Sequence, residues 1–155
     1  MRHPALLPLS HDHHHGLALA LRCRKQALGQ LKPLGAAGLR ERAEEFRLFG
    51  KELIPHFRAE EEVLFPAMAT RRPESAALID ELACEHETIR AALPQLEQTT
   101  GLSKLLFDLG DLLERHIRKE ERQLFSLFEA HAAEFDAGSL GAEILKALGR
   151  AHGKL

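Results

Sequence analysis

The sequence predicts an all-α protein, and its composition and hydrophobic spacing both indicate that class. Leu, Ala, Glu and Arg, which are strong helix formers, dominate the 155 residues, whereas β-branched residues are few. Apolar residues recur at spacings of three and four, and the sequence contains no alternating run typical of a strand. A chain of this length can form one domain with its own core. We therefore expect an up-down-up-down four-helix bundle with a short extra C-terminal helix.

Helix-breaking residues divide the chain into segments. Pro4 and Pro8 predict an irregular arm over residues 1–9, followed by the bundle over 10–133 and a short helix with a tail over 134–155. Glycine, proline and capping residues place the helices within these segments. The expected helices are about 10–31, 39–69 with a kink at Pro55, 73 to the turn at 98, 103–131, and 139–149.

One motif occurs twice in the same register. The first copy holds His56, Glu60-Glu61 and Leu64-Phe65, and the second copy, sixty residues later, holds His116, Glu120-Glu121 and Leu124-Phe125. Residues four apart lie on one face of a helix, so each copy directs an imidazole and a carboxylate to the same neighbour. The flanking apolar spacing places both pairs in the interior, where unpaired polar groups cost several kcal/mol. A shared cation would satisfy them.

Single histidines occupy similar positions on the other two helices. His86 lies on a stripe with Leu82 and Ile89. On the first helix, His14 aligns with Leu17 and Leu21, whereas His13 aligns with Leu17 and then with Ala20. The pattern favours His14 as the interior residue and leaves His13 as the alternative.

Imidazole and carboxylate donors together indicate a transition-metal site. Such donors suit iron, manganese or zinc, whereas calcium takes oxygen donors. Two carboxylates between two pairs of histidines suit a bridged pair of ions. We expect Glu61, Glu62 and Glu121 to form a solvated face, with orientation of ligand imidazoles as the alternative. The candidate metal ligands are His14 (or His13), His56, Glu60, His86, His116 and Glu120.

The order His, His-x-x-x-Glu, His, His-x-x-x-Glu resembles the bacterial type of the hemerythrin-like, or HHE cation-binding, domains. The resemblance covers about residues 10–131. It implies a four-helix bundle with two non-haem iron ions, the carboxylates of Glu60 and Glu120 as bridges, the histidines as terminal ligands, and an oxo bridge as a further ligand. It implies no catalytic residues beyond these. Oxygen-carrying relatives have another histidine where this chain has Leu82, and a His-x-x-x-x-Asp pair last, so simple reversible oxygen carriage is not the expected function.

The resemblance implies a reaction with a small molecule: hydrogen peroxide, nitric oxide or dioxygen. An enzyme with catalase-like peroxide or nitric oxide chemistry, acting in oxidative or nitrosative stress, is one class. A protein that senses or binds oxygen, iron or redox state without turnover is a second class, and an iron-storage protein that loads more than two iron ions is a third. The residues do not decide between the first two classes. The chain lacks Tyr and Trp, which weighs against tyrosyl-radical chemistry.

Charge and hydropathy indicate where the protein acts and which partners it lacks. The formal net charge is −2 and the basic residues form no stripe, so we expect no nucleic-acid partner. No segment has the length of a membrane span or the pattern of a leader peptide. We expect a cytoplasmic monomer or weak homodimer in which Cys23 and Cys84 do not form a disulfide.

Overall fold

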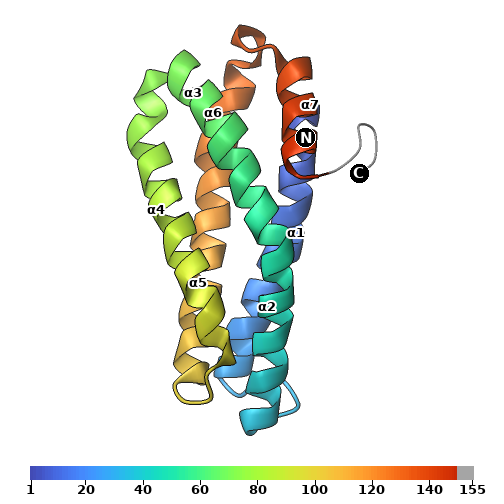
Figure 1. Cartoon of the computed structure of the whole chain (residues 1–155), viewed down its shortest axis with the longest axis vertical. Helices are drawn as coiled ribbons and strands as arrows, with labels where there is room; N and C mark the ends of the chain where they lie inside the picture. Colours follow the sequence, from blue (N-terminus) through green and yellow to red (C-terminus); the bar gives the residue numbers. More distant parts are fainter. Residues whose placement is uncertain (150–155) are drawn as a thin grey trace.

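The structure is a computed structural model that describes residues 1–149, so the end of the expected C-terminal segment, residues 150–155, lies outside the described residues. Every regular element within residues 1–149 is a helix. Four long rods run up and down beside one another, and a shorter helix packs at the end where the chain begins (Figure 1). The predicted all-α bundle with a short C-terminal helix is confirmed.

Each rod is made of two or three consecutive helical elements. The first rod is η1 (Pro4–Leu6) with α1 (Leu7–Ala27), the second is α2 (Gly35–Ala59), η2 (Glu60–Leu64) and α3 (Phe65–Arg71), the third is η3 (Pro73–Ser75), α4 (Ala76–Ala92) and η4 (Leu93–Glu97), and the fourth is α5 (Leu102–Lys119), η5 (Glu120–Leu124) and α6 (Phe125–Ala130). The turn η6 (Ala132–Glu134) leads into α7 (Ala137–Ala147). A side-chain oxygen of Asp136 caps α7 by accepting a hydrogen bond from the amide of Ser139.

The N-terminal segment is not the irregular arm that the prolines predicted. Pro4 begins η1, and Pro8 lies in the first turn of α1, where a helix has no use for the missing amide hydrogen. Leu6 and Leu9 are fully buried, so packing holds this segment against the bundle. Because proline is tolerated in the first turn of a helix, α1 begins about one turn before the predicted boundary.

The leucines used to predict the buried face of the first helix, Leu17 and Leu21, do not define that face, because Leu17 is only partly buried. Leu21 and Leu28 are exposed, whereas Ala20, Cys23 and Gln26 are buried. Small side chains let α1 and α5 approach closely: a Cβ atom on Gly110 would lie 2.7 Å from the carbonyl oxygen of Ala20. Leucine spacing missed this face because its residues are small or polar.

Both repeated motifs contain a π-helical turn, which the sequence analysis did not predict. The turns are η2 and η5, which begin at Glu60 and Glu120 and pass directly into α3 and α6. Pro66 lies in the first turn of α3 and does not end the rod. Single π turns inside α-helices often occur at functional sites.

Two apolar clusters fill the bundle, one toward each end. The first includes Phe46, Leu53 and Leu113, and the second includes Leu64 and Phe125. Helix α7 covers the second cluster with its buried leucine and isoleucine side chains. Between the two clusters, each rod carries buried polar residues. Across residues 1–149, none of the helices combines the length and the hydropathy that crossing a bilayer requires.

The close approach of α1 and α5 gives a testable prediction. Replacing Gly110 with Ala places a methyl group against backbone, and we expect a loss of about 1–3 kcal/mol in the free energy of unfolding. Gly138→Ala in α7 is the matched control, because a Cβ there meets nothing within 4 Å; its effect should be about 1 kcal/mol or less, in the stabilising direction. Urea unfolding of both variants at equal metal content measures this, and equal stability of Gly110→Ala and the parent would contradict it.

Candidate metal centre

A layer of buried polar side chains crosses the bundle between the two apolar clusters. Its six residues are each at most 3% exposed, and they are His13, His56, Glu60, His86, His116 and Glu120. They form two groups, and within each group the potential ligand atoms all lie within 4.8 Å of one another. One group contains His13 and His56, the other contains His86 and His116, and both glutamates belong to both groups. All four rods therefore contribute to one centre.

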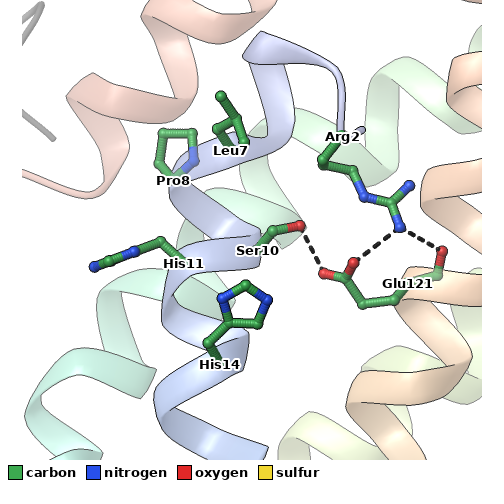
Figure 2. Close-up of a pocket in the computed structure, with 7 residues that line it drawn as sticks. All are labelled: Arg2, Leu7, Pro8, Ser10, His11, His14 and Glu121. Carbon is green, nitrogen blue, oxygen red and sulfur yellow. Dashed lines mark hydrogen bonds and ion pairs between the residues drawn. The ribbon is translucent and has the colours of Figure 1, made fainter.

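On α1 the structure brings His13, and not the favoured His14, into this layer. His14 is exposed and lines a surface pocket of about 520 Å³ beside Arg2 and His11 (Figure 2). His13 Nε2 lies 2.9 Å from Glu120 Oε1. The preference for His14 failed because it followed Leu21, which is exposed, whereas Leu17 is only partly buried against the first apolar cluster and is also aligned with His13.

Glu60 spans the two halves of the centre. Its Oε2 atom lies 3.4 Å from His56 Nε2, and its Oε1 atom lies 3.1 Å from His86 Nε2. One carboxylate therefore presents one oxygen to each group. This is the placement that a bridging ligand needs.

Glu120 spans the halves in the same way. Its Oε1 atom faces His13, and its Oε2 atom lies 3.5 Å from His116 Nε2. These approaches lack hydrogen-bond geometry, and all four carboxylate oxygens of Glu60 and Glu120 are buried without a hydrogen-bond partner. Native interiors rarely leave such atoms unsatisfied. Two buried carboxylates with four free oxygens fit a cation site.

Each of the four imidazoles contacts a further carboxylate through its Nδ1 atom, on the side of the ring away from Glu60 and Glu120. Four contacts join an imidazole Nδ1 to an outer carboxylate: His13 to Glu121 at 2.5 Å, His56 to Asp12 at 3.0 Å, His86 to Glu61 at 2.6 Å, and His116 to Glu85 at 2.8 Å. An Nδ1–H that donates to a carboxylate leaves the lone pair of a neutral imidazole on Nε2. All four rings thereby direct a metal-binding nitrogen toward the centre.

The inner nitrogens meet in pairs. His56 Nε2 lies 3.1 Å from His13 Nε2, and His86 Nε2 lies 3.1 Å from His116 Nε2. Two lone pairs at this distance repel each other unless a proton or a cation lies between them. The donor set therefore fits one cation in each half.

The sequence analysis missed two of the outer carboxylates and underrated two more. Asp12 and Glu85 were not singled out, although each directly precedes a histidine of the layer. Glu61 and Glu121 were expected mainly as solvated residues, but both contact ligand imidazoles, whereas Glu62 is exposed. The signal was the parallel between the two halves, in which an acidic residue follows each interior glutamate.

Burial and charge set the protonation of the layer when no cation is bound. Burial lowers the pKa of His56, but the Glu60 and Asp12 carboxylates raise it more, to about 10. The same balance raises the pKa of His86 to about 10 and that of His116 to about 9. Burial raises the pKa of Glu120, but the surrounding imidazoles bring it well below its ordinary value. Protons therefore compensate the carboxylates until a metal replaces them.

These pKa shifts predict how the stability of the metal-free protein depends on pH. Because the folded state raises the pKa of these histidines, their protonated form contributes to the free energy of unfolding. This contribution is fully present below pH 6.5 and is lost as pH rises through about 9 to 10. The depressed pKa of Glu120 contributes above pH 4.5 and is lost as pH falls.

Urea midpoints measured against pH test this prediction. The metal-free protein should be most stable between pH 4.5 and 6.5. Since metal binding releases these protons, the stability gained from metal should increase with pH. A metal-free protein that gains stability as pH rises from 6.5 to about 9 would contradict the assignment.

Comparison with known proteins agrees with this geometry. A family model described as the Hemerythrin HHE cation binding domain matches residues 6–137, which include every residue of the layer and all four outer carboxylates. No curated protein and no solved structure matched the sequence. The match covers most of the chain, and the buried histidines and glutamates agree with it. The chain belongs to the hemerythrin HHE cation-binding domain family.

Proposed function

We propose that the chain holds two iron ions as a carboxylate-bridged pair and uses them to react with hydrogen peroxide, nitric oxide or dioxygen. Domains of this family bind metal, typically iron. The observation that carries the proposal of a pair is the placement of Glu60 and Glu120, each of which presents one oxygen to each half of the centre.

The proposed ligands are His13 and His56 for one ion, His86 and His116 for the other, and both glutamates as bridges. Imidazole and carboxylate donors suit iron, with manganese or zinc as the alternatives. Each ion would then have about four protein ligands, which leaves coordination positions open for a small molecule. Bound iron supplies two one-electron redox centres next to these open positions.

Burial supports a very small substrate. The six proposed ligands are at most 3% exposed, and apolar clusters lie on both sides of their layer along the bundle. The rings of Phe57 and Phe65 stack on His86, with centroids at 3.9 Å and 5.6 Å. Such a layer would exclude bulk water and large substrates, which favours a molecule of two to four atoms as the substrate.

Leu82 supports a reactive centre over a simple carrier. It occupies the place where oxygen-carrying relatives have a further histidine, and here it is fully buried in the second apolar cluster. The half built by His86 and His116 therefore gains no third imidazole from α4. Fewer protein ligands leave that ion more open to a substrate.

The outer carboxylates provide the acid-base path of the proposed reaction. Glu121 contacts His13 Nδ1 on one side and lines the surface pocket on the other (Figure 2). Arg2 holds Glu121 through its side chain and backbone oxygen, at 2.9 Å and 3.2 Å. This carboxylate orients the imidazole and can exchange a proton with solvent.

We further propose that the protein acts in the cytoplasm, in the defence against oxidative or nitrosative stress. Cys23 and Cys84 are both free, as thiols are in a reducing compartment. All six proposed ligands come from one chain, so a monomer or weak homodimer would have a complete centre.

The first test is metal content together with the optical spectrum and peroxide turnover of protein purified without chelators. We expect about two iron ions per chain, near-ultraviolet bands of an oxo bridge, and sustained oxygen release from peroxide. Iron with a single stoichiometric spectral change on addition of peroxide, oxygen or nitric oxide would favour the sensing or binding function instead. Absence of iron, or zinc alone, would reject both redox functions.

Neighbouring histidines on α1 provide a matched pair of variants for this assay. His13→Ala and His56→Ala should lose iron and turnover, because each removes one imidazole of the same half. His14→Ala should keep both, since His14 is exposed. Far-ultraviolet circular dichroism checks that each variant folds. Retention of iron by His13→Ala together with its loss from His14→Ala would contradict the assignment.

Neighbouring glutamates in η2 test the outer carboxylates. Glu61→Ala removes the group that holds His86 and should weaken iron binding about 10- to 100-fold. Glu62→Ala is the control, because its side chain is 63% exposed and pairs only with Arg58 among the described ion pairs. Competition with a chelator measures the affinities, and equal values for the two variants would reject a role for Glu61.

A further inference from the structure

A second set of metal-binding side chains lies on the outer face of α1. His11 and His15 are one helical turn apart and exposed, and their ring centroids lie 5.1 Å apart at an interplanar angle of 59°. Two histidines at this spacing can reach one ion from one helix. The metal centre uses neither side chain.

The outer pair has almost the same mutual arrangement as the inner pairs. The rings of His13 and His56 are 4.8 Å apart at 54°, and those of His86 and His116 are 4.7 Å apart at 58°. The inner pairs need contributions from two helices each, whereas the outer pair needs α1 alone. The same ring separation therefore occurs in three places, two buried and one at the surface.

Glu52 on α2 adds a carboxylate to the outer pair. Its Oε2 atom lies 4.0 Å from His15 Nδ1, and both side chains are about half exposed. Nitrogen and oxygen ligands bind a zinc-like ion at about 2.0–2.2 Å, so two ligand atoms about 4 Å apart can share one ion. Among the described residues, only the buried layer has three or more ligand atoms already within 4.8 Å of one another. The exposed side chains of His11, His15 and Glu52 would therefore rotate to give three ligands to one ion, with water for the remaining positions.

The outer residues are separate from the metal centre. Figure 2 shows His11 and Ser10 leaving α1 on different sides, and Ser10 Oγ donates a hydrogen bond to Glu121 at 2.7 Å. His11 instead points away from Glu121 and the fourth rod. A metal bound by His11 would therefore face solvent.

We propose that His11, His15 and Glu52 bind one divalent transition-metal ion at the surface of α1 and α2. Imidazole and carboxylate donors suit Zn²⁺, Ni²⁺ and Cu²⁺, with the tightest binding for Cu²⁺. Because the ligands are exposed, this ion exchanges with solvent, in contrast to ions held in the buried layer. The proposal is independent of the function of the buried centre.

The test compares Zn²⁺ and Cu²⁺ binding to the full chain and to the double variant His11→Gln/His15→Gln. The buried layer is the same in both proteins, so a difference in the number of metal ions that they bind is due to the outer site alone. Equilibrium dialysis should show one bound equivalent fewer for the variant. The electron paramagnetic resonance spectrum of the matching Cu²⁺ equivalent should show coupling to two nitrogens in the parent protein and disappear in the variant.

Two further variants define the site. His14→Gln should keep the equivalent, because His14 lines the same pocket as His11 but is not one of the three proposed ligands. Glu52→Gln should weaken it without abolishing it, since the two imidazoles remain. Equal binding by the parent and the double variant, or loss of the equivalent in His14→Gln with retention in His15→Gln, would overturn the proposal. Unchanged thermal unfolding of the metal-free variants shows that any loss is local.

Discussion

Two carboxylates buried at the middle of the bundle impose the main constraint on this structure. Glu60 and Glu120 have no exposed surface, and their four oxygens have no hydrogen-bond partner. Isolated charges in such a place would cost many kcal/mol. Successive shells of polar groups offset this cost. Imidazoles surround the two carboxylates, and an outer carboxylate contacts each imidazole. Cationic side chains such as Arg90 and Lys119 contact the outer carboxylates. Charge therefore alternates from the centre to the surface.

This alternation follows an approximate two-fold pattern in the chain. Asp12-His13 on α1 corresponds to Glu85-His86 on α4, and the two copies of the repeated motif supply the remaining groups. The outer carboxylate that supports each imidazole comes from a different rod, so the contacts tie the rods together. The halves differ in their apolar surroundings, because Phe57 stacks on His86 while the equivalent position in the second motif is Ile117. Two ions bound here would have similar ligands but different neighbours.

Repeated polar residues among leucines made most of the centre predictable from the sequence. His56, Glu60, His86, His116 and Glu120 all follow apolar stripes that the structure buries. The spacing between His and Glu then gives their common face.

The remaining features depend on packing that leucine spacing does not reveal. The buried face of α1 carries Asp12, Gly16 and Ala20, so its register favoured the wrong histidine. A charged residue such as Asp12 is predictable as buried only when its partner, His56, is known to be close. The π turns at Glu60 and Glu120 leave no local signal that we identified, although both occur at the same place in the repeated motif.

The central claim is that Glu60 and Glu120 both bridge a pair of metal ions. A crystal structure of the iron-loaded protein, with anomalous diffraction data collected at the iron absorption edge, tests it most directly. The account predicts two anomalous peaks in the buried layer, one beside His13 and His56 and one beside His86 and His116, with an oxygen of each glutamate bound to each ion. A single peak, or iron only on the outer face of α1, would contradict it.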